Sequence, residues 1–379
     1  MRLERVESHD PRDVLRALRG AVLGAGPAAA LGEAPELPRS VPAGTALVLT
    51  TSGSTGVPKS VLLSRSALTA SAMATAARIG SGQWLLPLAG GYIAGVQVMV
   101  RSLVEGRDPA VLSGRFTPAS FVHATSGMRS FEAGERVPTF TSLVPAQLQT
   151  LVDAAAESAD VRRALASFDT ILVGGQALPV RLRERAAVAG ATIVRTYGST
   201  ETSGGCVYDG VPLGDTRLDV SDGEVLISGP SLADGYLDDP ERTAAAFETD
   251  GDGVRWYRTG DAGTIDDGVL AVTGRIDSVI VSGGVNVSLD RVERIVRELD
   301  GLEDAVVVAA PHERWGQTPV LVVAADDPDA AERLLETARA AVAREAGKPA
   351  RPTRVVRIDA VPRLPSGKPD RRALAERVR

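Results

Sequence analysis

The sequence predicts an α/β protein with a large N-terminal layered α/β domain, a small β-rich subdomain and a smaller, mobile α+β C-terminal domain. Three observations predict this. Short apolar runs alternate with helical segments from residue 45 to about 209, which is typical of a mainly parallel sheet covered by helices. From about residue 210 onwards, strands and turns dominate. After residue 277, strand and helix patterns occur together again. We therefore expect domains over 1–276 and 277–379.

The N-terminal 40 residues are expected to be peripheral. Asp10 and Pro11 are suited to the start of one helix that runs to residue 23, because Asp caps helices and Pro tolerates the first turn. A Pro/Gly/Ala-rich stretch then reads as a connector. In the layered domain we expect strands at 45–50, 84–88, 138–145, 170–175 and 192–198, and helices at 64–80, 145–158, 161–168 and 179–190.

The remaining elements follow the same reasoning. Strands of the β-rich subdomain are expected at 223–230, 254–265 and 268–275. In the C-terminal domain we expect helices at 290–300 and 328–347 and strands at 304–311, 319–326 and 354–363.

Composition excludes several classes of protein. The chain has 379 residues and a net charge of −6, which disfavours general nucleic-acid binding. It has no uninterrupted apolar run long enough for a membrane span, and no apolar signal core follows its start. One cysteine and three scattered histidines disfavour disulfides and Cys/His metal sites. We expect a cytoplasmic enzyme.

Lysine usage is unusual. The basic residues are 39 Arg and only three Lys, at positions 59, 348 and 368. Lys is a compact charge on a flexible stem, whereas Arg is a rigid planar fork. Lys59 and Lys368 both lie in glycine-containing loops, TSGSTGVPKS and PSGKPDRR, so we interpret them as functional, with chance survival as the alternative.

The first of these loops follows an apolar strand and could wrap an anion. Its hydroxyls, backbone N–H groups and Lys59 can donate to phosphate oxygens. It is not a Walker loop, because Val57 and Pro58 separate the lysine from the glycine. The alternative is a surface loop. The candidate phosphate-binding residues are Thr51, Ser52, Gly53, Ser54, Thr55, Gly56 and Lys59.

A second polar segment, YGSTETSGG, follows a predicted strand, where open α/β sheets bind ligands. Tyr197 offers a flat face for a base, and Glu201 is a hard oxygen ligand suited to Mg²⁺. Upstream, Gly174 and Gly175 would let a base approach the backbone. Each feature alone is weak evidence, because a Glu in a polar loop is usually solvated. Further candidates here are Gly198, Thr200 and Thr202.

Two more segments carry candidate ligands. Asp261 in YRTGD could accept hydrogen bonds from a ribose diol, and Arg275 in GRID could donate to ribose or phosphate. A surface Arg–Asp pair is the alternative. Gly283 and Gly284 would permit close backbone approach to a narrow ligand.

Taken in order, these five segments resemble the adenylate-forming superfamily of acyl-CoA synthetases, adenylation domains and luciferases, from about residue 45 to 375. Within this superfamily the chain is most similar to the o-succinylbenzoate–CoA ligases of menaquinone biosynthesis. Three features carry this resemblance: the short region before the phosphate loop, TSLVPAQL, and the segment from Thr196 to Leu213. The resemblance implies an AMP-forming acid–thiol ligase that uses ATP, Mg²⁺ and coenzyme A. It implies no nucleic-acid partner, and the oligomeric state stays open, with a homodimer as one option.

The resemblance also implies roles for individual residues. Lys368 would bridge the carboxylate, ribose and α-phosphate, with Thr200 on the α-phosphate and Glu201 on Mg²⁺. Asp261 and Arg275 would hold the ribose and Tyr197 the adenine. Asp277 would be the pivot of the C-terminal domain, and Gly283 and Gly284 would line the pantetheine channel.

The acyl pocket is less determined by the resemblance. Many relatives carry a His where Tyr92 or Gly91 stands here. Arg195 is a candidate cation for a second substrate carboxylate, with a structural salt bridge as the alternative. The other pocket candidates are Tyr92, Thr141, Ser142, Gln147, Ser203 and Gly204. Another aryl- or acyl-CoA ligase, a carrier-protein-loading enzyme and a non-enzymatic nucleotide-binding module remain competing readings.

Overall fold

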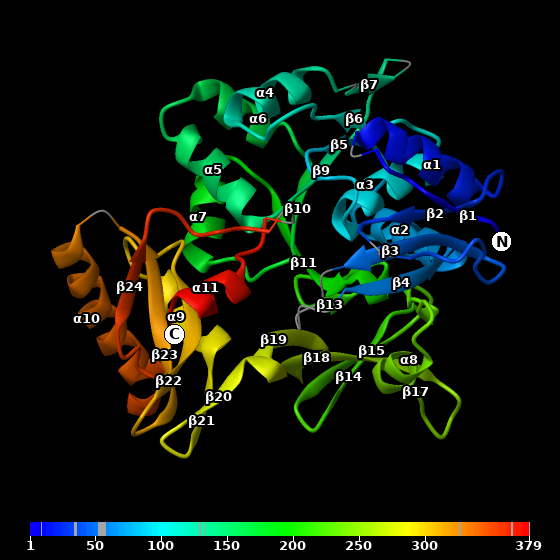
Figure 1. Ribbon diagram of the computed structural model, residues 1–379. Coiled ribbons are helices and arrows are strands. Elements are labelled where there is room, and N and C mark those ends of the chain that lie inside the picture. The colour runs from blue at the N-terminus through cyan, green and yellow to red at the C-terminus, as the bar shows by residue number, and fades with distance from the viewer. Residues whose placement is uncertain are drawn as a thin grey trace.

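The computed structural model describes residues 1–8, 10–33, 36–51, 58–128, 130–132, 134–325, 327–364 and 367–378. Figure 1 shows the N-terminal sheets and helices as one layered body, with the C-terminal part, coloured yellow to red, packed beside it. The predicted phosphate-loop residues 52–56 lie outside the described residues.

The first sheet, in the described chain, has five strands in the order β1-β2-β3-β4-β16. β1, β2 and β3 are parallel, whereas β3, β4 and β16 are antiparallel. The prediction of a peripheral connector after residue 23 was wrong, because β2 lies inside this sheet and all four of its residues are buried. The strands are β1 (Leu3–Arg5), β2 (Ala28–Leu31), β3 (Thr45–Thr51), β4 (Lys59–Ser64) and β16 (Gly235–Tyr236).

The second sheet of the described chain has seven strands in the order β13-β12-β11-β10-β9-β5-β6. The run from β6 to β11 is parallel, as predicted, and β12 and β13 add antiparallel strands. The strands are β5 (Gln83–Leu86), β6 (Ala110–Val111), β9 (Thr139–Leu143), β10 (Thr170–Val173), β11 (Ile193–Ser199), β12 (Gly204–Tyr208) and β13 (Val211–Pro212). β7 (Phe131–Glu132) and β8 (Glu135–Arg136) form a separate hairpin.

Helices cover these sheets, and their ends follow from capping chemistry. Asp10 accepts a hydrogen bond from Arg12 N at the start of α1, and Ser64 caps α2 through Ala67 N. The helices are α1 (Pro11–Leu23), α2 (Arg65–Ile79), α3 (Ile93–Val104), α4 (Pro118–Ser126), α5 (Pro145–Ala155), α6 (Ala159–Ala166) and α7 (Val180–Val188), with a 3₁₀ turn η1 (Thr200–Thr202) after β11.

The predicted β-rich subdomain is present as an antiparallel sheet in the order β14-β15-β18-β17, with β19 also paired to β18. Its long central strand, β18, carries the RTGD segment and therefore fixes Asp261 within a sheet. The elements are β14 (Arg217–Ser221), β15 (Glu224–Ser228), α8 (Pro240–Ala246), β17 (Phe247–Thr249), β18 (Arg255–Asp266) and β19 (Val269–Arg275).

The C-terminal part forms its own sheet with helices, in the order β21-β20-β23-β22 and with β24 paired to β23. A short 3₁₀ turn, η2 (Ile276–Ser278), connects it to β19. The other elements are β20 (Val279–Ser282), β21 (Val285–Ser288), α9 (Leu289–Arg297), β22 (Val306–His312), β23 (Gly316–Ala324), α10 (Pro328–Glu345), η3 (Lys348–Ala350), β24 (Val355–Ile358) and α11 (Arg371–Arg377).

The buried cores divide at the η2 turn. Buried apolar residues up to Leu270 form the clusters of the N-terminal part, and those from Ile280 onwards form separate clusters. Two cores joined by one short turn allow the parts to move as units. No described helix is long and apolar enough to span a membrane.

Helix α1 provides a test of whether the N-terminal residues belong to the core rather than to a peripheral segment. Leu18 has no exposed surface, whereas Leu23 on the same helix is 58% exposed. Leu18→Ala should lower the free energy of unfolding by about 2–5 kcal/mol through lost burial and a residual cavity. Leu23→Ala should change it by less than about 0.5 kcal/mol. Urea denaturation of both variants checks this, and equal effects would contradict the assignment of α1 to the core.

Candidate active site

The site forms at the carboxyl edge of the parallel strands. β9, β10 and β11 are neighbours with the same direction, so the loops that follow them meet at one edge of the sheet. The Gly174–Gly175 loop follows β10, and the η1 turn with Glu201 follows β11. From the other direction, β18 contributes Asp261, and the C-terminal part contributes Lys368.

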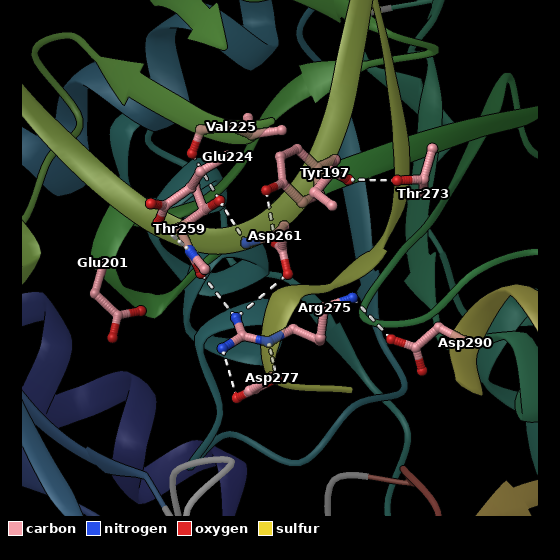
Figure 2. A network of polar contacts seen from close by, with 12 residues as sticks. Tyr197, Glu201, Glu224, Val225, Thr259, Asp261, Thr273, Arg275, Asp277 and Asp290 are labelled. Atoms are coloured by element: carbon pink, nitrogen blue, oxygen red, sulfur yellow. Dashed lines mark hydrogen bonds and ion pairs between the residues drawn. The ribbon is translucent and has the colours of Figure 1, made fainter. Parts of the chain in front are cut away.

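A polar network occupies one side of this edge (Figure 2). Tyr197 donates its hydroxyl to Asp261 Oδ2 at 2.6 Å, and Arg275 Nη1 lies 3.3 Å from Asp261 Oδ1. The same guanidinium donates to Thr259 O at 2.7 Å and pairs with both carboxylate oxygens of Asp277 at 3.1 Å. Tyr197 and Arg275, assigned by sequence analysis to adenine and ribose, thus both contact Asp261, the other ribose candidate.

Burial and charge shift the pKa values in this network. Burial raises the pKa of Asp261, although Tyr197 and Arg275 oppose that change. Burial, with the nearby Asp261 carboxylate, also raises the pKa of Tyr197, so this phenol stays protonated and remains a donor. Burial acts to lower the pKa of Arg275, but its contacts with Asp277 and Asp261 outweigh this and raise it. The network therefore presents a guanidinium and a hydrogen-bonded carboxyl group to a ligand.

A second cluster surrounds Glu201, which is 2% exposed. Its Oε1 accepts from Lys59 Nζ and, at 2.9 Å, from the hydroxyl of Tyr236. Burial alone would raise the pKa of Glu201, but the Lys59 ammonium outweighs this effect and lowers it. Glu201 is therefore a buried carboxylate whose negative charge is matched by one cation.

The Glu201 environment fits a hard cation. Carboxylate oxygens are among the ligands that Mg²⁺ prefers, and the Lys59 ammonium now holds this one. The described residues hold no group of three or more His, Cys, Asp and Glu placed around a metal ion. A single protein carboxylate suits Mg²⁺ that arrives with nucleotide phosphates, since this ion usually keeps water and phosphate ligands.

Lys368 enters the same cleft from the C-terminal part. A side chain built on Gly175 would place its Cβ 3.9 Å from Lys368 Cε. The lysine remains open to solvent, but the cleft walls remove part of its hydration, which lowers its pKa, while Asp261 and Glu201 partly offset this. Both carboxylates therefore act electrostatically on its ammonium.

The YGSTET segment is built tightly. Thr202 is fully buried, accepts from Ser199 N at 2.8 Å and donates to Gly204 O at 2.7 Å. A Cβ on Gly198 would lie 2.2 Å from Gly204 O. Thr202 and Gly198 therefore shape the turn, while Thr200 lies buried at its start.

Two different structural reasons favour glycine at positions 174 and 175. A Cβ on Gly174 would lie 2.2 Å from Thr196 Oγ1, so β11 excludes a side chain there. Gly175 has a φ of 83°, which favours glycine, and it faces Lys368. The prediction that the pair lets a base approach the backbone stays a prediction.

The strands on either side of the phosphate loop, β3 and β4, form an antiparallel pair. Thr51, the last residue of β3, pairs with Lys59, the first residue of β4. β4, which sequence analysis did not predict, lies between this loop and α2. Buried Thr51 Oγ1 has no hydrogen-bond partner within the described chain.

The predicted acyl-pocket residues are spread over several environments. Tyr92 and Gln147 line a cavity of about 320 Å³ together with Val144, Arg363 and Gly367, so both parts of the chain form its wall. The Gln147 side chain, however, accepts from Val144 N and donates to Pro87 O. Two further candidates, Thr141 and Ser142, are buried in β9, where Thr141 donates to Leu85 O.

Arg195 shows the salt bridge that was the alternative for it. Its Nε lies 3.0 Å from Asp209 Oδ1, and about half of its side chain is exposed. A buried arginine that sequence analysis missed lies on α3. Arg101 is 4% exposed, its guanidinium lies 4.9 Å from the Trp84 ring, and Nη2 lies 3.4 Å from the Tyr208 hydroxyl. The only sequence signal was an arginine within an apolar stretch.

Unsatisfied polar groups follow the seam between α3 and β12. Ser203 Oγ, Gln97 Oε1 and Arg101 Nε are buried without hydrogen-bond partners in the described chain. Gln97 packs on Gly204, since a Cβ there would lie 2.9 Å from Gln97 Cγ. Arg101 lies one turn further along the same helix face.

Gly283 and Gly284 form the turn between β20 and β21. A Cβ on Gly283 would lie 2.6 Å from Trp315 Cε3, and Gly283 N donates to Trp315 O at 2.9 Å. A Cβ on Gly284 would meet no atom within 4 Å. In this arrangement Lys368 contacts the cleft, and the Gly284 position is open.

Comparisons with known proteins show which family the chain belongs to. The family model "AMP-binding enzyme" matches residues 4–237, and "AMP-binding enzyme C-terminal domain" matches 291–368. The chain is 40% identical over 344 residues to a probable 2-succinylbenzoate–CoA ligase of Mycobacterium tuberculosis, covering 88% of this chain and 84% of that relative.

Solved structures show the same likeness. The o-succinylbenzoate CoA synthetase of Bacillus subtilis, in complex with the acyl-adenylate intermediate OSB-AMP, has a TM-score of 0.72 and 26% identity, over 87% of this chain and 69% of that one. The amide bond synthetase McbA of Marinactinospora thermotolerans has a TM-score of 0.72 and 27% identity, over 92% and 75%. From the matched family models and the 40% identical relative, this chain belongs to the AMP-binding enzyme family.

Proposed function

We propose that this enzyme is an AMP-forming 2-succinylbenzoate–CoA ligase of menaquinone biosynthesis. It activates the acid as an acyl-adenylate and then transfers the acyl group to coenzyme A. The observation that carries the chemistry is the placement of Lys368 beside Gly175, in the cleft that also holds Asp261, Arg275 and Glu201. The likeness to 2-succinylbenzoate–CoA ligases supports the substrate.

Each cluster has a separate task in nucleotide binding. Asp261 accepts hydrogen bonds from the ribose diol, and Arg275 adds a donor beside it. Tyr197 is fixed by its bond to Asp261 and stacks against the adenine. The loop between Thr51 and Lys59 holds the β- and γ-phosphates through N–H, hydroxyl and ammonium donors.

Glu201 would hold Mg²⁺, which when bound with ATP neutralises phosphate charge. Lys59 now pairs with Glu201, and it can turn to phosphate oxygens when a cation takes its place. Thr200, at the start of the same turn, is placed to donate to the α-phosphate.

In the first half-reaction a carboxylate oxygen of the acid attacks the α-phosphorus. A new P–O bond forms, the bond to the β-phosphate oxygen breaks, and pyrophosphate leaves with that electron pair. The protein supplies positioning and charge neutralisation. The Lys368 ammonium bridges the carboxylate, ribose and α-phosphate as negative charge builds.

In the second half-reaction the thiolate sulfur of coenzyme A attacks the adenylate carbonyl. A C–S bond forms, the C–O bond to AMP breaks, and AMP leaves. We propose that units 1–276 and 277–379 rotate about Asp277 between the steps, which withdraws Lys368. The turn at Gly283 and Gly284 then lines the thiol channel. A closed site of this kind excludes water from the activated acid.

The second substrate carboxylate is assigned to the α3–β12 seam. Arg101 makes no ion pair with a described carboxylate; its electrostatic influence reaches Glu105, whose carboxylate accepts from Gly82 N. A buried cation without a direct ion pair is costly. The ring carboxylate of 2-succinylbenzoate would supply the partner charge, with Gln97 and Ser203 beside it. We therefore place Arg101, rather than Arg195, in this role.

Two other readings keep the same nucleotide chemistry. The likeness to an amide bond synthetase favours testing an amine as acceptor. Carboxylate-dependent ATP–pyrophosphate exchange over aromatic and succinyl acids identifies the acid, and product analysis with coenzyme A, an amine or a carrier protein identifies the acceptor. Exchange only with other acids, or no thioester with coenzyme A, would contradict the proposal.

Lys368→Ala separates the half-reactions. It should slow adenylate formation by about 10²–10³-fold, as expected for the loss of one transition-state donor. It should largely spare thioester formation from pre-made adenylate, because the lysine has left the site by then. Single-turnover assays of each step measure this, and equal losses in both steps would refute the division of roles.

The pH dependence of adenylation follows from the lowered pKa of Lys368. The ammonium is required, so the exchange rate should fall as pH rises through that pKa, at a lower pH than for an ordinary lysine. Lys368→Arg keeps its charge to much higher pH. It should be slower but lack this alkaline fall. The same fall in both enzymes would assign it to another group.

Arg101→Met removes the buried charge with little change in volume. The probe acids are 2-succinylbenzoate and 4-oxo-4-phenylbutanoate, which lacks the ring carboxylate. In the unmodified enzyme kcat/KM should favour 2-succinylbenzoate by about 30–100-fold, the size of a buried charged hydrogen bond. The variant should lose most of this preference. An unchanged ratio would exclude Arg101 from the carboxylate site, whereas Arg195→Met should leave the ratio unchanged.

A further inference from the structure

The first turn of α7 is capped by the C-terminal part of the chain. Pro179 precedes the helix and makes no side-chain cap, so the first backbone N–H groups need acceptors. Glu298, at the end of α9, supplies them: Oε1 accepts from Val180 N at 2.8 Å, and Oε2 lies 3.4 Å from Arg181 N.

A second acidic residue reinforces this contact. Asp300 follows Glu298 in the turn after α9 and pairs with the Arg181 side chain. The Glu298 carboxylate thus lies at the positive end of the α7 helix dipole, and the Asp300 carboxylate pairs with the guanidinium of Arg181 on the same helix. All these groups come from segments more than 115 residues apart, with separations of 117 to 119.

The loop that leads into the capped helix also lies beside Lys368. Gly175, which faces Lys368 Cε, lies in the connection from β10 to α7. Val180, which donates to Glu298, is the first residue of α7. When Glu298 caps α7, the C-terminal part is therefore in the position that brings Lys368 to the cleft. A rotation that withdraws the lysine from this loop would also take Glu298 from the helix.

We propose that Glu298 is a positioning residue, an interdomain helix cap that favours the arrangement for adenylate formation over the arrangement for thioester formation. This inference rests on the proposed two-step function. Asp300 and Arg181 add a smaller, exposed contribution. The cap is weak enough to be broken in each cycle, because such a cap changes an equilibrium by about fivefold.

The test compares two single-turnover rates in the full-length enzyme: adenylate formation from 2-succinylbenzoate and MgATP, and thioester formation from pre-made adenylate and coenzyme A. Their ratio follows the populations of the two arrangements. Glu298→Ala should lower the ratio of adenylation to thiolysis by about fivefold. A merely structural role for Glu298 would reduce both rates together and leave the ratio unchanged.

Glu303→Gln is the matched control. Glu303 lies in the same turn region and accepts only from Gly301 N among its described contacts, so its removal changes charge without uncapping α7. The control should keep the ratio of the unmodified enzyme. If both half-reactions proceed but Glu298→Ala keeps the ratio, or if Glu303→Gln lowers it equally, the cap is refuted. If the unmodified enzyme performs neither half-reaction, the proposed function itself fails.

Discussion

Charge compensation inside one partly dehydrated cleft governs the arrangement of this enzyme. Asp261 is held by Arg275 and Tyr197, Glu201 is held by Lys59 and Tyr236, and both carboxylates act electrostatically on the Lys368 ammonium. Removing such groups from water is costly unless each is paired. A bound nucleotide would replace part of these pairings, because phosphates accept from the cations and the ribose donates to Asp261. The same electrostatics that stabilises the site therefore prepares it for a negatively charged substrate.

The division of the chain adds a second constraint. The buried cores separate at the η2 turn, so the C-terminal part can move without unpacking either core. The contacts that hold it include the Glu298 cap on α7, the Arg181–Asp300 pair, the bonds from Arg275 N to Asp290 and from Arg294 to Thr273 O, and the position of Lys368 beside Gly175. Contacts of this kind can break while both cores stay packed. The proposed movement of the C-terminal part between the two steps requires this.

Much of this molecule was predictable from its sequence, but unequally. Strong alternation and helix caps predicted β9, β10, β11, α2 and α5, and the polar, glycine-containing segments pointed to residues that meet in the clusters around Asp261 and Glu201. β2 was missed because its Ala-rich sequence resembles a connector, and burial in a sheet decides its conformation. α3 was missed because Gly91, Gly95 and the apolar run obscure its period. Arg101 could not be recognised, since its importance comes from long-range contacts with Trp84 and Tyr208.

The most direct test of the central claim is a pair of crystal structures. One would contain a non-hydrolysable sulfamoyl analogue of the acyl-adenylate, and the other the same analogue with coenzyme A. The account predicts that Lys368 Nζ hydrogen-bonds the analogue in the first structure and has left the cleft in the second, with the turn at Gly284 beside the pantetheine. A lysine that keeps one position outside hydrogen-bond reach of the nucleotide in both structures would contradict it.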